Sequence, residues 1–428
     1  MKNIFLELEN KLFKETSWAF ATKGIAFLLY FSLNVYLART LGIEKFGVWS
    51  FFFSLLTIIL LLSHFGINSS ARKYVAQYNK TKELNSVLKS SVKLRFIFSL
   101  IFTILFFLIH KPLAELIGRP EFASLFLFSI PLILLSGLVE FLKNVFIGLH
   151  RIKYNFIINS LEYGLKLLLV IFFFLFSLEL LNIINSFTIA TLITSIIGFY
   201  FLYKNFYLKN QLSRQKDFTG DILKYSIPLF FVSIGFLIAT EVDTLMLGLL
   251  TASTEVGIYA VAKQIIIKLP HLSLAIAMGT MPVFAKLNKN NKEKLKKLFY
   301  KLLKINTFVF LIISFIIIFF SWFFVPLIFG VQYNASVLPL QILTIYLLCF
   351  SFSMFLSPFL DYQGLAKRRA VNLSISMVLN IILNFILIPS HGAVGAAIAT
   401  SASYLPYIIL NWIEVQKVFK TNYVSKTF

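Results

Sequence analysis

The sequence contains one cysteine and few charged residues. Cys349 is the single cysteine and lies in an apolar stretch, so no disulfide can form within the chain. Charged residues make up 14% of the 428 positions, against about 25% in soluble domains. The five histidines include no pair at the spacing of metal ligands, and we expect neither a metal site nor a cofactor.

The motifs of soluble enzymes are also absent from the sequence. We find no glycine-rich phosphate loop, no nucleophile elbow and no paired-carboxylate motif of an enzyme outside the predicted spans. The predicted outer loops are all short, which leaves no room for an extracytoplasmic domain. The sequence therefore predicts a transporter and not an enzyme.

Apolar residues are abundant, at 58% of the chain with a mean hydropathy of +0.84. The apolar runs approach the roughly 20 residues that a helix needs to cross a bilayer, and they lack the alternation of β-barrel strands. We predict an all-α polytopic membrane protein with about twelve transmembrane helices. The predicted spans are residues 16–38, 46–64, 94–110, 122–147, 156–178, 182–203, 226–250, 256–283, 303–329, 335–360, 371–389 and 392–415.

Positive charge is distributed unevenly among the predicted loops. The inner segments hold 31 of the 40 Lys and Arg residues, whereas the outer loops hold only Arg39, Lys45, Lys111 and Arg119. Because cytoplasmic loops are enriched in these residues, both termini are predicted in the cytoplasm, with the chain in the cell membrane. Topology and contact with anionic membrane lipids then explain the net charge of +22, and we expect no nucleic-acid partner.

An internal sequence repeat, here called the internal echo, predicts that the chain consists of two halves. Residues 46–49 (FGVW) match 256–259 (VGIY) at an offset of 210, and residues 148–153 (GLHRIK) resemble 364–369 (GLAKRR) at an offset of 216. Two six-helix lobes, each entered from the cytoplasm, are predicted to be parallel repeats. The N-terminus has no small-residue cleavage site, so we expect it to be retained. The predicted parts are a cytoplasmic amphipathic N-terminus (1–15), an N-lobe (16–203), a cytoplasmic linker (204–225), a C-lobe (226–415) and a cytoplasmic C-terminus (416–428).

Ionisable residues inside the predicted spans are the candidate functional residues, because charge in hydrocarbon is costly and usually faces a cavity. Glu241 and Asp243 lie in the seventh span, and Lys263 and Lys268 lie in the eighth. Glu241 and Asp243 are two residues apart and point to different sides of their helix. We expect one of them to pair with a lysine of the eighth span, and the other to bind a coupling cation or to face water.

The first half contains further candidates. Lys166 lies about 15 Å along its helix from the nearer span end, too deep to reach the headgroups, and Lys23 also lies in a span. Glu162 precedes Lys166 by four residues and Glu140 precedes Lys143 by three, so mutually neutralising pairs with only a packing role remain an open alternative. Lys143 lies about four residues from a span end, and we interpret it as reaching the headgroups.

Three motifs carry a family resemblance. They are residues 39–42 (RTLG) followed by 46–47 (FG), residues 243–247 (DTLML) followed by 255–259 (EVGIY), and the run from NIILN at 380–384 to GAVGAAIAT at 392–400. Together they resemble the polysaccharide-transport family, which comprises the O-antigen and lipid-linked oligosaccharide flippases. That family belongs to the multidrug/oligosaccharidyl-lipid/polysaccharide (MOP) superfamily, with the MATE extruders and the lipid II flippase. The resemblance covers nearly the whole chain and implies a MATE-like fold of two lobes.

The resemblance implies a flippase for an oligosaccharide on a polyprenyl phosphate or pyrophosphate, which serves O-antigen lipopolysaccharide or another surface glycan by alternating access. If the protein is such a flippase, we expect the span residues Lys166, Lys263, Lys268 and Lys23 to bind the head group, and Glu241, Asp243 and Glu162 to serve ion pairing or coupling to H⁺ or Na⁺. The implied partners are the lipid-linked oligosaccharide, membrane lipids and an associated glycan polymerase or glycosyltransferase. Two alternatives remain open, a cation-coupled multidrug exporter of the same superfamily and an integral-membrane sugar transferase.

Overall fold

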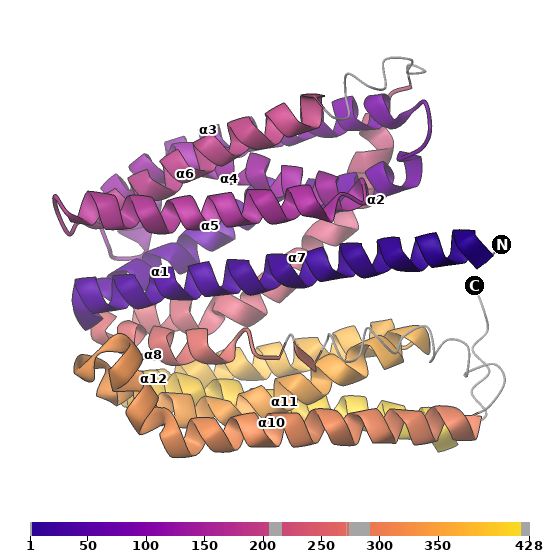
Figure 1. Ribbon diagram of the computed structural model, residues 1–428. Coiled ribbons are helices and arrows are strands. Elements are labelled where there is room, and N and C mark those ends of the chain that lie inside the picture. Colours follow the sequence, from indigo (N-terminus) through magenta and orange to yellow (C-terminus); the bar gives the residue numbers. More distant parts are fainter. Residues whose placement is uncertain (1, 205–215, 271, 274–291, 421–428) are drawn as a thin grey trace. The chain divides into compact units, whose positions relative to one another are not determined.

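The computed structural model describes residues 2–204, 216–270, 272–273 and 292–420, whose regular elements are helices (Figure 1). An apolar chain favours this result, because a helix satisfies its backbone hydrogen bonds internally. The elements are α1 (Lys2–His64), α2 (Ile67–Tyr78), α3 (Leu84–Leu116), α4 (Phe122–Gly148), α5 (Ile152–Phe174), α6 (Leu180–Leu202), α7 (Thr219–Leu250), α8 (Ser253–Ile266), α10 (Lys292–Phe329), the 3₁₀ helix η3 (Val331–Ser336), α11 (Val337–Tyr362) and α12 (Ala366–Lys420).

Eight helices of the described residues are long and apolar enough to cross a membrane, or nine if the two parts of α7 count as one span. The chain is therefore a multi-pass membrane protein. The apolar stretches of α1 and α12 run over 48 and 55 residues, whereas about 20 suffice for one crossing. Each contains one non-helical glycine, Gly42 (φ 77°) and Gly392 (φ 50°), in a region that glycine enters readily because it has no Cβ. Each long helix thus consists of two stretches that meet at a glycine.

The predicted spans correspond to these helices, or to one stretch of α1 or α12, with one partial exception. The eighth predicted span covers 256–283, but α8 ends at Ile266 and Lys268 lies beyond that end. Pro270 follows, and a proline lacks the amide that a continuing helix would use. Residues 274–283 of this span, 205–215 of the predicted linker and 421–428 of the predicted C-terminus lie outside the described residues.

The chain forms two compact units. Unit 1 contains Met1–Tyr36 and Phe52–Ile238, and unit 2 contains Leu37–Phe51 and Ala239–Phe428. Both α1 and α7 therefore contribute residues to each unit. In unit 2, Arg39 of α1 donates from Nε to the carbonyl of Ile328 (2.7 Å), near the C-terminal end of α10. A cation is favourable there because the last carbonyls of a helix carry partial negative charge.

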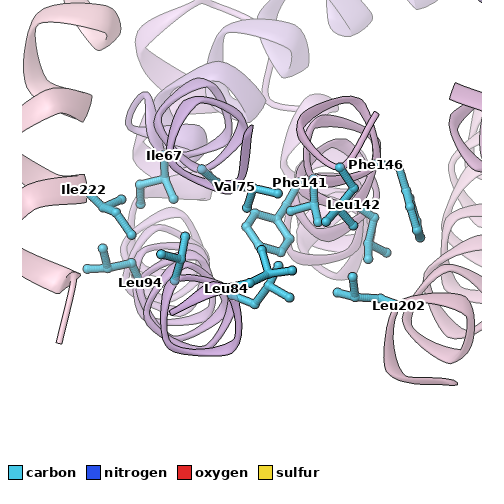
Figure 2. Packing of buried hydrophobic residues seen from close by; sticks show 14 of the residues in the cluster. Ile67, Val75, Leu84, Leu94, Phe141, Leu142, Phe146, Leu202 and Ile222 are labelled. Carbon is cyan, nitrogen blue, oxygen red and sulfur yellow. The ribbon is translucent and has the colours of Figure 1, made fainter. Parts of the chain in front are cut away.

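The hydrophobic core of unit 1 joins α2 to α3, α4, α6 and α7 (Figure 2). The buried residues Ile67, Ala71 and Val75 of the short helix α2 are four apart and form one stripe. Figure 2 shows Ile67 and Val75 of this stripe among buried residues such as Leu94 of α3 and Phe141 of α4. Because burial of apolar surface is the main favourable term in folding, this core holds the start of α2 against α4.

A capping carboxylate determines where α7 begins. Asp217 Oδ1 accepts hydrogen bonds from the Thr219 amide (2.9 Å) and the Thr219 hydroxyl (2.5 Å), which satisfies an amide of the first turn. These hydrogen bonds hold the pKa of the Asp217 carboxyl below its usual value. The cap therefore contributes at neutral pH, and its contribution is lost as the pH falls through that lowered pKa.

The two glycines of the internal echo meet in unit 2. A Cβ on Gly47 would lie 1.7 Å from the carbonyl oxygen of Ser253, and a Cβ on Gly257 would lie 2.3 Å from that of Ile43. Ile43 and Ser253 are 210 residues apart, as are the two glycines, so the contact is symmetric. The backbones of α1 and α8 therefore touch at this crossing, and any side chain at either glycine would force them apart.

Candidate functional site

Four ionisable side chains of α4 and α5 form a buried group in unit 1, the unit 1 charge cluster (Glu140, Lys143, Glu162 and Lys166). The members on each helix are three or four residues apart, so they share one helix face. Lys143 Nζ lies 2.6 Å from Glu162 Oε2 and 3.3 Å from Glu140 Oε2. Lys166 Nζ lies 2.5 Å from Glu162 Oε1. The cluster is thus a continuous chain of alternating charges across two helices.

Burial of this cluster is tolerable because its charges cancel. Lys143 and Glu162 are 8% and 6% exposed, and two carboxylates offset two ammonium groups. Lys166 also lies 5.0 Å from the ring centre of Phe187, a distance at which a cation is attracted to an aromatic face. Glu140 differs from the others, since 44% of its side chain is exposed. The cluster therefore has one accessible end, at Glu140.

The interpretation that Lys143 reaches the headgroups is wrong. Its ammonium group is buried because α5 places Glu162 2.6 Å away, and an ion pair with a hydrogen bond favours the interior over an extended side chain. The pairing of Glu162 with Lys166, which the sequence left as an alternative, is present. Lys166 is therefore paired in this structure.

Arg95 of α3 is one of the 31 Lys and Arg residues counted with the inner segments, and it is buried. Its side chain is 0% exposed. Nη1 donates to the Ser63 carbonyl (2.7 Å) in the last turn of α1, where a cation meets the negative end of the helix. A Cβ on Gly137 would lie 1.6 Å from Nη2, so the glycine leaves room for the guanidinium. Arg95 joins α3, α4 and the end of α1.

In unit 2, an ion pair joins α7 to α8. Lys263 Nζ donates to Glu241 Oε2 (3.1 Å) and to the Thr244 hydroxyl (2.9 Å). The side chains of Lys263 and Glu241 are 16% and 23% exposed. We predicted that one of Glu241 and Asp243 pairs with a lysine of the eighth span. In the structure, Glu241 forms this ion pair with Lys263.

Asp243 is the centre of a second buried group in unit 2, the Asp243 cluster (Asp243, Tyr259, Asn380, Asn384 and Thr400). Its Oδ1 accepts a hydrogen bond from Asn384 Nδ2 (2.7 Å). Its Oδ2 accepts from the hydroxyls of Tyr259 (2.9 Å) and Thr400 (2.8 Å). Asp243 is 4% exposed, and no Lys or Arg among the described residues lies within ion-pair distance of it. The cluster thus holds a carboxylate surrounded by neutral donors.

These oxygen atoms could hold a proton or a small cation. A buried carboxylate without a compensating charge is unfavourable, so a bound cation would stabilise the cluster. Asn384 Oδ1 is buried without a hydrogen-bond partner in the described structure, and Asn380 Oδ1 accepts from Asn384 Nδ2 (3.0 Å). A single carboxylate with neutral oxygens suits a monovalent ion, whereas divalent ions usually take more carboxylates. Within the described residues, no group of three or more His, Cys, Asp or Glu side chains suits a transition metal.

The other two lysines assigned to the head group are exposed. Lys23 lies on the part of α1 in unit 1, and Lys268 follows α8 in unit 2. The structure therefore divides the four predicted lysines into two kinds. Lys166 and Lys263 are mostly buried and paired with a carboxylate, whereas Lys23 and Lys268 present accessible side chains.

Sequence reasoning did not identify the neutral members of the Asp243 cluster. Asparagine and threonine within a span carry no charge, so the cost argument used for ionisable residues does not single them out. A usable signal was nevertheless present. Asn380 and Asn384 are four residues apart in an apolar run and so share one helix face, a pattern that predicts a polar contact with another helix.

Comparison with known proteins relates the chain to two families and to several relatives. The profile of the polysaccharide biosynthesis protein family matches residues 12–288, and that of the MatE family matches residues 228–386. The chain is 25% identical over 419 residues to an uncharacterized membrane protein of Methanocaldococcus jannaschii, with 93% of this chain and 95% of that protein covered. It is 29% identical over 192 residues to the probable low-salt glycan biosynthesis flippase Agl15 of Haloferax volcanii, with 44% and 39% covered.

A solved structure shares the fold. The lipid II flippase MurJ in an inward closed conformation matches with a TM-score of 0.72 at 17% identity, and the match covers 95% of this chain and 89% of that one. The all-helical polytopic fold is therefore of the MATE and MurJ kind, as predicted. The predicted family is confirmed as well, because its profile matches more than half of the chain. The protein belongs to the polysaccharide biosynthesis protein family.

Proposed function

We propose that the protein is a flippase that moves an oligosaccharide linked to polyprenyl phosphate or pyrophosphate from the inner to the outer leaflet by alternating access. One observation carries this proposal. Ammonium groups are held inside apolar helices by carboxylates, at Lys166 and Lys263, with 11% and 16% of each side chain still exposed. A phosphate oxygen can replace the carboxylate in such a pair, because charge-assisted hydrogen bonds to either anion are similar in geometry.

The proposal includes an architecture of twelve spans. α1 and α12 each have the length for two crossings and a glycine between them, and the glycines of the repeat make a symmetric contact. These features support two six-helix lobes as parallel repeats, with lobes at 16–203 and 226–415 and both termini in the cytoplasm. The exported product is a surface glycan, of which O-antigen lipopolysaccharide is one form.

The exposed lysines have a separate role in this proposal. Lys23 and Lys268 lack the close burial of Lys166 and Lys263, so they attract the anionic lipid head group through a longer-range field. The paired lysines then bind the phosphate at short range. The polyprenyl chain stays in the bilayer, because transfer of its hydrocarbon to water is unfavourable.

Alanine substitution of these lysines tests the proposal. We expect Lys166→Ala and Lys263→Ala each to reduce surface glycan about 10-fold or more, since a hydrogen bond to a charged group contributes about 1.5–3 kcal/mol. Lys268→Ala should reduce it less, because the field of an exposed charge is screened by salt. Glycan export is measured in cells whose own flippase gene is deleted, at matched membrane abundance. Lys301→Ala, on an exposed position of α10, is the control and should leave export unchanged. Wild-type export in all three test variants would remove the lysines from the mechanism.

The Asp243 cluster is proposed as the coupling site. Its buried carboxylate without an opposite charge suits a coupling H⁺ or Na⁺, whose binding would change the interactions that tie α7 to α8 and α12. This role is distinct from head-group binding, because an anion would be repelled by the carboxylate. The ion that raises the stability of the protein identifies the coupling partner.

One alternative has an observation in its favour. The MatE profile matches residues 228–386, and a buried carboxylate in that segment is a feature that a cationic drug could use. A cation-coupled multidrug exporter would confer drug resistance while surface glycan stayed intact in a deletion strain. The net basic character of the chain favours anionic cargo and hence the flippase.

A further inference from the structure

A cavity of about 160 Å³ lies within unit 1, and Glu140, the exposed end of the unit 1 charge cluster, forms part of its wall. It is lined by the end of α1, the first turn of α2, and parts of α4 and α7. The core described above holds α2 against α4, so the walls of the cavity are fixed by packing. No role in head-group binding or coupling has been assigned to this cavity.

Two polar groups of the lining lack partners within the described structure. Asn68 is 6% exposed, yet its Oδ1 makes no hydrogen bond, and His64 Nε2 is likewise buried without a partner. Buried polar groups are nearly always hydrogen-bonded, because an unpaired one forfeits its hydration without compensation. Both residues line the same cavity, and a rotation of either side chain would bring its polar atom to an occupant.

The lining offers hydrogen-bond donors and acceptors together. Gly66 is the N-cap of α2 and has no side-chain cap, so amides of the first turn at the cavity can donate. The Glu140 carboxylate, 44% exposed, can accept, and the Asn144 amide lies beside it. A neutral group with many hydroxyls can satisfy both sides, because each hydroxyl donates and accepts.

The volume of the cavity suits one ring. A cavity near 150 Å³ accommodates a six-membered ring such as benzene. Phe230 contributes an aromatic face to the lining, against which the C–H face of a sugar ring can pack. Phe230 is held in place by Phe65, with ring centres 4.7 Å apart.

We propose that this cavity binds one pyranose ring of the transported glycan. The inference rests on the proposed function and adds to it a sugar subsite, separate from the lysines that bind the phosphate. Asn68, Asn144 and Glu140 make hydrogen bonds to ring hydroxyls, and Phe230 packs against the ring face. The subsite would let the flippase favour glycans by their sugar as well as by their lipid phosphate.

Cysteine protection tests the subsite on the purified full-length protein in nanodiscs. Ser233 lines the cavity, so Ser233→Cys in a Cys349→Ser background places one thiol there. The rate of its reaction with a small methanethiosulfonate reagent is measured with methyl glucoside, methyl galactoside, methyl N-acetylglucosaminide, mannitol or inorganic phosphate. At about five times its dissociation constant, at least one glycoside should slow labelling about sixfold, because only the unoccupied site reacts. Mannitol, an open-chain polyol, and phosphate should have no effect.

Asn68→Leu tests whether glycoside binding can be lost while the stability of the fold is kept. It removes an unpartnered buried oxygen, so the melting temperature should stay unchanged or rise while glycoside protection disappears. Asn155→Leu is the matched control, since Asn155 is 8% exposed and its Oδ1 accepts from Asn159 Nδ2 (2.8 Å), away from the cavity lining. It should lower the melting temperature and keep the protection.

Three outcomes would overturn the subsite. They are no protection by any glycoside of the panel, protection by phosphate alone, and full protection in Asn68→Leu. The proposed flippase function is tested separately, by measuring transport of lipid-linked oligosaccharide by the same protein in vesicles. Transport without glycoside protection would remove the subsite and leave the flippase in place, whereas protection without transport would overturn the flippase.

Discussion

Replacing Glu162 with alanine should lower the free energy of unfolding by about 3–5 kcal/mol, because it leaves two buried ammonium groups without their shared carboxylate. Glu162 Oε2 lies 2.6 Å from Lys143 and Oε1 lies 2.5 Å from Lys166, and Lys143 is 8% exposed. The only remaining carboxylate near Lys143 is Glu140, at 3.3 Å, among the described residues. The change is measured as the loss of chemical or thermal stability of the purified protein.

Two further variants show whether charge causes the loss. The triple variant Glu162→Leu, Lys143→Met, Lys166→Met replaces the buried charges by apolar side chains and should recover most of the stability, since such replacements are often close to neutral. Asp361→Ala removes an ion pair whose carboxylate side chain is 40% exposed and should cost less than about 1 kcal/mol. A small effect of Glu162→Ala, equal to that of Asp361→Ala, would contradict the buried cluster.

Asp243→Asn should abolish the response of the protein to its coupling ion and reduce glycan export. Asp243 is the only charged member of its cluster, so the isosteric amide keeps the shape and removes the charge. In the wild type, a cation at about 100 times its dissociation constant should stabilise the folded state by about 2.7 kcal/mol. Melting temperatures are compared in Na⁺, K⁺ and N-methylglucamine at constant ionic strength, and across a pH series.

The control for this experiment is another carboxylate of unit 2. Glu255 Oε2 accepts from the amide of Ala393 (2.7 Å), just after the break in α12, so Glu255→Gln should lower stability while the response to the ion persists. A melting temperature that rises in Na⁺ identifies Na⁺, and one that rises only in acid identifies H⁺. A wild type that responds to neither, or an Asp243→Asn variant that responds as the wild type does, would contradict the coupling role.

More of the fold than of the candidate site could be predicted from the sequence. Runs of apolar residues determine where helices cross hydrocarbon, and the predicted ranges correspond to helices or to one stretch of a helix. The breaks at Gly42 and Gly392 are harder to predict, because a glycine within an apolar helix is common and only the backbone shows which one adopts positive φ. The short helix α2 was overlooked, although its stripe at Ile67, Ala71 and Val75 has helical spacing.

The candidate site shows that depth along a helix does not by itself predict whether a charged side chain is buried. Counting residues from a span end placed Lys143 within reach of the headgroups, but its environment depends on Glu162 of a neighbouring helix. Arg95 is fully buried for a similar reason, since it meets the end of α1 at Ser63. Pairs on one helix, such as Glu162 and Lys166, were predictable because their spacing is local. Contacts between helices could not be predicted in this way, because they depend on how the helices pack together.

Reconstituted transport tests whether the protein is a flippase for lipid-linked oligosaccharide. Purified protein is placed in vesicles that contain lipid-linked oligosaccharide extracted from the cells that carry it, and an impermeant glycosidase is added outside. The account predicts that wild-type vesicles expose the inner-leaflet pool to the enzyme, and that Lys263→Ala vesicles expose only the outer-leaflet pool, as protein-free vesicles do. An inner-leaflet pool that stays protected in wild-type vesicles, while the same vesicles transport a cationic dye, would contradict the flippase and favour the drug exporter.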